Sequence, residues 1–127
     1  MYKPYHLIGL ELGISVLSAA LRGEATGQPC GFRGDAVAIA KRALRAGEML
    51  DGEGGYTVWG KLIPAERSLA EGALPIGLAH KVELLRDVAA GEIVGWSDVQ
   101  MPESEAVRAR RDMGRRFAAP PDAIAAQ

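Results

Sequence analysis

The chain has 127 residues, enough for about one domain, and its 15 basic and 16 acidic residues leave a formal net charge of −1. This balance gives no electrostatic reason to expect nucleic acid or an anionic membrane as a partner. The single cysteine, Cys30, excludes an internal disulfide and is typical of a reducing compartment, so we expect a cytoplasmic protein.

The first predicted element is one long apolar helix over residues 5–22, placed between Pro4 and Gly23. Proline is favoured in the first helical turn and glycine just beyond the end. The apolar run is too short to span a membrane, and Glu11 interrupts it. Because a small β domain cannot surround a helix that is apolar on all sides, we expect residues 1–24 to pack on another subunit or on a domain outside this chain. The expected interface residues are Leu7, Leu10, Ile14, Leu17 and Leu21.

Polar residues form one stripe on this predicted helix. Glu11, Ser15, Ser18 and Arg22 are separated by four, three and four positions, which places them on one side. One interpretation is a cleft in which Glu11 acts as an acid and His6 as a proton donor. The other is a buried carboxylate satisfied by serine hydroxyls, with His6 at a solvated helix end.

The chain then carries the same motif twice. After a Gly/Pro-rich connector at residues 25–35, a shift of 44 positions aligns Arg42 with Arg86, Gly47 with Gly91 and Glu48 with Glu92. An alternating apolar stretch precedes each copy and predicts a strand with one buried face, followed by a turn and a short returning strand. We therefore expect a pseudo-symmetric β domain over residues 36–100 with flanking helices, which is an α+β, mainly β fold.

The last segment, residues 101–127, is predicted to form a charged helix and a disordered tail. The helix, from about Glu103 to Phe117, has no convincing apolar stripe. Its basic cluster, Arg108 to Arg116, has acidic residues close by and is expected to be a solvated face.

Several side chains in the β domain are candidate contacts for a small ligand: Arg42, Tyr56, Trp59, Lys61 and Arg86. The alternative is that Arg42/Glu48 and Arg86/Glu92 form surface ion pairs beside each turn, with the aromatic residues in the core or an interface. No motif assembles an acid, a base and a nucleophile, so we expect no catalysis by this chain alone.

Metal and nucleotide sites are not expected either. Cys30, His6 and His80 do not have the spacing of a metal-ligand set. No phosphate-binding glycine motif follows a predicted strand, so we expect no cofactor in this chain.

The duplicated segments, AIAKRALRAGEMLDGEG and VELLRDVAAGEIVGWSDVQ, resemble the SAF domain, a β-clip module. Asp51 and Asp98 are similar to the acidic position that follows the SAF motif. The resemblance implies a β-clip (SAF-like) fold for residues 36–100, preceded by the long apolar helix.

A wider resemblance runs from Tyr5 to about Val99 and includes GFRGDAVAIAKR, GEMLDGEGGYTVWGKL and LPIGLAH. These segments are similar to the C-terminal region of homoserine-dehydrogenase-like NAD(P)-dependent oxidoreductases that contain a SAF domain, one branch of which is reductoisomerase-like and acts on 1-deoxy-D-xylulose 5-phosphate (DXP). Family members carry a Rossmann domain and a catalytic domain before this region. The resemblance therefore implies a fragment, a split protein or a stand-alone relative, with NAD(P) bound only by the missing domain.

Two functions are consistent with these observations. The first is a non-catalytic accessory or oligomerisation module, whose partner is a second copy or a separate Rossmann/catalytic domain. The alternative is a stand-alone module that binds a small molecule such as a sugar or sugar acid.

Overall fold

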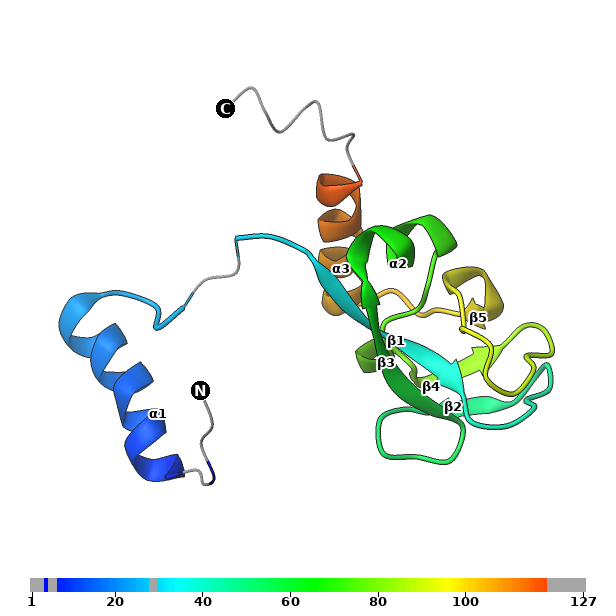
Figure 1. The fold of residues 1–127 in the computed structure, drawn as a ribbon, viewed down its shortest axis with the longest axis horizontal. Coiled ribbons are helices and arrows are strands. Elements are labelled where there is room, and N and C mark those ends of the chain that lie inside the picture. Colours follow the sequence, from blue (N-terminus) through cyan, green and yellow to red (C-terminus); the bar gives the residue numbers. More distant parts are fainter. Residues whose placement is uncertain (1–3, 5–6, 28–29, 119–127) are drawn as a thin grey trace. The chain divides into compact units, whose positions relative to one another are not determined.

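The computed structural model describes residues 4, 7–27 and 30–118, and it divides into two units (Figure 1). The first unit is Met1–Cys30 and the second is Gly31–Gln127. The predicted disorder beyond Ala118 and the position of His6 lie outside the described residues.

The first unit contains the α-helix α1, Ile8–Leu17, followed by the π-helical turn η1, Ser18–Arg22. The prediction of one long apolar helix was wrong, because the α-helix has ten residues and the hydrogen-bond pattern then widens into the π turn. Gly23 ends the segment with a φ of 65°, a left-handed conformation that glycine adopts without strain.

The second unit is built from two small antiparallel sheets. One pairs β1, Gly34–Ala40, with β3, Val58–Pro64. The other has the order β2-β4-β5, with bounds Met49–Asp51, His80–Leu84 and Val99–Gln100. Together with the described α-helices α1, α2 (Ala65–Glu71) and α3 (Glu105–Phe117), they confirm the predicted α+β class.

The sequence repeat reappears in the backbone hydrogen bonds of the second unit. Leu44 and Val88, which are equivalent positions, bond each other through N–H···O distances of 2.8 and 2.9 Å. The Ala40 N–H donates to the Glu92 carbonyl, and the equivalent Leu84 N–H donates to the Glu48 carbonyl. The two copies are therefore related by a local pseudo-twofold axis that passes between Leu44 and Val88.

Strand β1 is buried on both faces, although its alternating pattern predicted a single buried face. Val37 and Ile39 belong to one apolar cluster, whereas Ala38 and Ala40 belong to the other. The second buried face was missed in the sequence because Ala38 and Ala40 are only weakly apolar. Their small side chains allow their cluster to approach the strand closely. The returning strand expected at Ile93–Val94 consists only of isolated bridging contacts, one of which pairs Ile93 with Ile39.

Helix α3 is anchored by a nearly buried ion pair. Ser104 caps its start by accepting the Val107 N–H at 3.2 Å, and Val107 is buried. Arg110 Nη2 lies 2.7 Å from Asp35 Oδ2 of β1, with exposed side-chain fractions of 12% and 10%. Ser68 of α2 donates to the same oxygen at 2.6 Å. The prediction of a solvated basic face is therefore wrong for Arg110, which connects α3 to β1.

Candidate functional site

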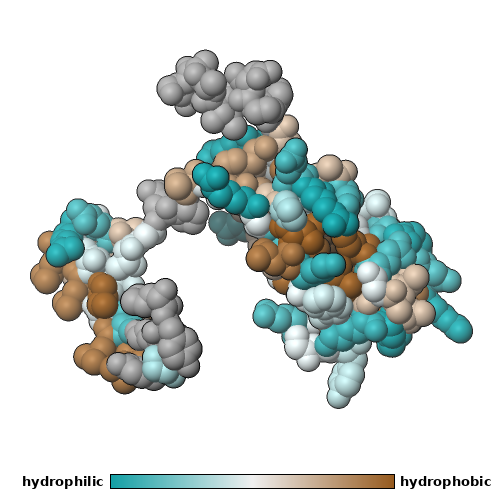
Figure 2. Space-filling model, in the orientation of Figure 1, coloured by the Kyte–Doolittle hydropathy of each residue, from teal (hydrophilic) through white to brown (hydrophobic). Residues whose placement is uncertain are grey.

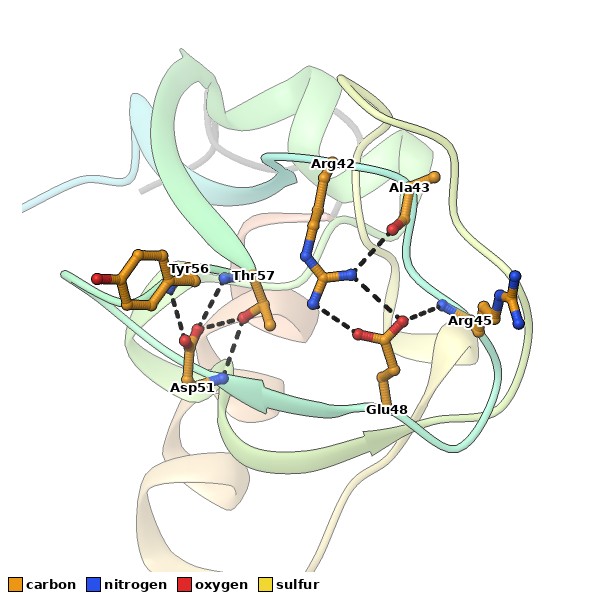
Figure 3. Close-up of polar contacts among 7 residues, drawn as sticks. All are labelled: Arg42, Ala43, Arg45, Glu48, Asp51, Tyr56 and Thr57. Carbon is orange, nitrogen blue, oxygen red and sulfur yellow. Dashed lines mark hydrogen bonds and ion pairs between the residues drawn. The ribbon is translucent and has the colours of Figure 1, made fainter.

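The two repeated turns hold both arginines that were predicted to contact a ligand, Arg42 and Arg86. In the first turn, Arg42 Nη2 lies 2.7 Å from Glu48 Oε2, and Glu48 also accepts the Arg45 N–H at 2.8 Å (Figure 3). In the second, Arg86 Nη2 lies 2.9 Å from Glu92 Oε1. Both ion pairs of the alternative interpretation are formed, so each guanidinium is held by its own turn.

These contacts shift the pKa values of both carboxylates. The side-chain hydrogen bond from Arg42 lowers the pKa of Glu48, and the Arg45 N–H lowers it further. The Ala89 N–H and then Arg86 lower the pKa of Glu92. Both groups are held as anions that stabilise a turn, which leaves neither suited to act as a proton donor near neutral pH.

The second turn has an additional partner that the first one lacks. Arg86 donates to Asp98 through Nε at 2.6 Å and through Nη2 at 2.8 Å, and the Asp98 side chain is only 8% exposed. Burial alone would raise the pKa of Asp98, but the hydrogen bonds from Arg86 and the Gly95 N–H outweigh it and hold the pKa below its ordinary value. The position equivalent to Asp98 in the first copy is Gly54, which cannot make this contact.

This asymmetry gives a matched pair of substitutions. We expect Arg86→Ala to lower the free energy of unfolding by about 1 to 2 kcal/mol, because it leaves the Asp98 carboxylate buried without its cation. We expect Arg42→Ala to leave the urea midpoint unchanged, because Arg42 and Glu48 are both solvated. Equal effects in urea unfolding would show that the bond to Asp98 contributes nothing.

Asp51 closes the glycine-rich loop between β2 and β3. Its carboxylate accepts hydrogen bonds from the Tyr56 N–H at 2.6 Å, the Thr57 N–H at 3.0 Å and the Thr57 hydroxyl (Figure 3). The Thr57 hydroxyl and the Tyr56 N–H hold the pKa of Asp51 at about 2. A Cβ atom at Gly55 would lie 2.2 Å from this carboxylate, so the loop requires glycine there. Asp51 therefore fixes the conformation of its own loop.

The other ligand candidates lie on β3 and the loop before it. Tyr56 is 86% exposed and Trp59 is 45% exposed, and Lys61 is also exposed. The Tyr56 ring points away from the Arg42–Glu48 pair (Figure 3). A groove of about 450 Å³ lies beside Arg86, but its lining includes none of the other four ligand candidates. The described pockets do not gather the five residues into one binding site.

The predicted interface residues are all solvent-exposed in the first unit. Leu7, Leu10, Ile14, Leu17 and Leu21 have exposed fractions between 50% and 79%. No described residue of α1 or η1 is buried. Figure 2 shows apolar surface on this unit.

The polar stripe of the first unit is engaged locally. Glu11 Oε1 accepts the Leu7 N–H at 3.4 Å at the start of α1. Ser15 Oγ lies 3.1 Å from Thr26 Oγ1, beyond the end of η1. Because His6 lies outside the described residues, the proposed pairing of His6 with Glu11 in a cleft stays a prediction.

The described residues offer neither a metal site nor a membrane-spanning helix. No group of three or more His, Cys, Asp or Glu side chains there could hold a metal ion. No described helix combines the length and apolar character needed to cross a membrane.

No pattern in the sequence indicates the nearly buried Asp35–Ser68–Arg110 cluster. Its members lie on β1, α2 and α3, and Asp35 and Arg110 are 75 positions apart. No local spacing could have revealed such a contact. Because the cluster joins these three elements, its role is structural.

Comparison with known proteins adds no family assignment, because no protein-family model and no curated protein matches this chain.

Proposed function

We propose that this chain is a non-catalytic association module whose apolar N-terminal segment, residues 7–21, binds a protein partner. The observation that carries this proposal is the exposure of the five interface residues, none of which is less than half exposed. Soluble proteins seldom leave so many neighbouring apolar side chains in water unless the surface is used.

The expected energy of burial is large enough for association. Covering the exposed parts of these five side chains would contribute about 6 kcal/mol per chain. Two chains would thus contribute an amount similar to the loss of translational and rotational freedom that association must overcome. The segment supports a moderate, concentration-dependent association.

The resemblance to the C-terminal region of homoserine-dehydrogenase-like oxidoreductases suggests the setting of this module. In such an enzyme the SAF-like β-clip unit would be an accessory or oligomerisation element, and NAD(P) would bind to the separate Rossmann domain. The two repeated turns and their local pseudo-twofold axis support a duplicated SAF-like motif.

The alternative, a stand-alone module that binds a sugar or sugar acid, has less support. Arg42 and Arg86 would have to exchange their carboxylate partners for the ligand. The exposed Tyr56 and Trp59 are not gathered around either arginine in a described pocket.

The experiment that tests this proposal is sedimentation of the full chain over a concentration series. We expect the average mass to rise with concentration, from that of one chain, 13.5 kDa, towards a discrete oligomer. A mass that stays at one chain up to about 200 μM, well above typical micromolar association constants, would contradict association between copies.

A further inference from the structure

A groove of about 390 Å³ lies in the second unit, lined mainly by residues of α2 and α3 (Figure 1). Trp96, at the start of the 3-10 turn η3 (Trp96–Asp98), forms part of its wall. Leu69 of α2 forms another part, and both side chains are half-buried. This volume is at the lower end of the range for small-molecule sites, so the groove suits a ligand with one or two rings.

The groove stays open because α3 has a glycine where it faces α2. Gly114 lies in the interior of α3, where glycine is less favourable than alanine. A Cβ atom at this position would lie 3.5 Å from Leu69 Cδ2 and 3.3 Å from Arg110 Nη1. A large side chain here would therefore project into the groove. The opposite wall is held by a backbone bond of 2.9 Å from the Trp96 N–H to the Gly72 carbonyl.

The charged side chains that line the groove are all cationic. Arg110, Arg111 and Arg115 belong to its lining, and no acidic residue of the described part of the chain does. The carboxylates that pair with them lie outside the lining: Asp35, Glu103 and Asp112. The Arg111 guanidinium lies 5.5 Å from the centre of the Trp96 ring, so a cation adjoins the aromatic wall.

These arginines retain donors for a further acceptor. Arg111 uses only Nη1 in its described ion pair and Arg115 uses only Nη2, whereas a guanidinium carries five N–H donors. Both side chains reach the surface, with exposed fractions of 43% and 75%. Arg110 Nε is buried and has no hydrogen-bond partner among the described residues. The groove thus has more donors than acceptors around it, which favours an anionic ligand.

We propose that this groove binds a small organic anion, namely a carboxylate on a flat apolar body. Arg111 and Arg115 are four positions apart on α3, so they lie on one side of the helix and bind the carboxylate. Trp96 and Leu69 contact the apolar body. The site lies entirely within the second unit, so this proposal and the association of the N-terminal segment can fail separately.

Titration of the full chain with 2-naphthoate, followed by nitrogen-edited proton NMR, tests the site. The chain has two tryptophans, and Trp59→Phe assigns their indole N–H signals. We expect the Trp96 signal to shift saturably, with a dissociation constant of about 1 mM or below, and the Trp59 signal to stay unchanged. The neutral 2-naphthamide and the ring-free acetate should each bind at least roughly fivefold more weakly, because each lacks one half of the recognition.

Two matched double variants test the role of the arginines. Arg111→Gln/Arg115→Gln should weaken naphthoate binding about tenfold, because the carboxylate loses both cations. Arg108→Gln/Arg116→Gln removes the same charge from exposed positions of α3 outside the lining, and should change binding by less than about twofold. The urea midpoint checks that each variant keeps its fold.

Saturable Trp96 shifts that weaken in the first double variant and persist in the second would support the site. The assignment would be overturned by an unmoved Trp96 signal up to about 10 mM naphthoate, by equal weakening in the two double variants, or by naphthamide binding as well as naphthoate. The comparison of ligands uses the original chain, so it decides the matter even if a variant fails to fold.

Discussion

Asp35→Ala is expected to lower the free energy of unfolding of the second unit by about 3 kcal/mol, because it leaves the Arg110 guanidinium nearly buried without its counter-ion. Asp35 accepts from both Arg110 and Ser68, so its removal breaks two contacts at once. The Arg110 guanidinium also lies 5.0 Å from the centre of the Phe32 ring, and this contact alone cannot replace a carboxylate. Urea unfolding followed by circular dichroism measures the loss.

A matched control separates this effect from the loss of any ion pair. Arg67 and Glu71 form an exposed pair at 2.6 Å on α2, and Glu71→Ala should cost less than about 0.5 kcal/mol. The double variant Asp35→Leu/Arg110→Met should recover part of the loss, since an apolar pair leaves no buried charge. If Asp35→Ala proves as mild as Glu71→Ala, then α3 is not anchored through Asp35.

The sequence predicted the parts of this fold that depend on local spacing. Arg42, Glu48, Arg86 and Glu92 occupy equivalent places because each turn repeats one pattern of side-chain and backbone hydrogen bonds. A pattern contained within seven residues is visible in the sequence. The contact between Leu44 and Val88 was not predicted, because aligning the two copies does not say which equivalent positions meet at the axis.

Features that depend on distant contacts could not be predicted in this way. Arg110 resembles its neighbours in a charged helix, and only the approach of Asp35 from β1 makes it nearly buried. The widening of the N-terminal helix at Ser18 was also hidden, because an apolar composition does not distinguish α-helical from π-helical hydrogen bonding. The sequence shows Asp98 in the second copy and Gly54 at the equivalent position of the first. It does not show that Asp98 pairs with Arg86.

The second large effect is expected in the mass of the oligomer that the chain forms in solution. Leu10→Glu with Ile14→Glu places two charges in the centre of the exposed apolar segment, residues 7–21, where association would have to desolvate them. We expect this double variant to be monomeric at concentrations where the original chain associates. Because both residues are more than 60% exposed, the urea midpoint of the second unit should stay unchanged.

The most direct test of an exposed association segment is therefore light scattering after size exclusion. It would compare the original chain, Leu10→Glu/Ile14→Glu, and the control Leu62→Glu/Leu85→Glu, whose residues are similarly exposed on the second unit. The account predicts an oligomer for the original chain and the control, and a folded monomer of 13.5 kDa for Leu10→Glu/Ile14→Glu. An unchanged mass combined with a severe loss of stability in Leu10→Glu/Ile14→Glu would contradict it, because residues 7–21 would then be core of their own chain.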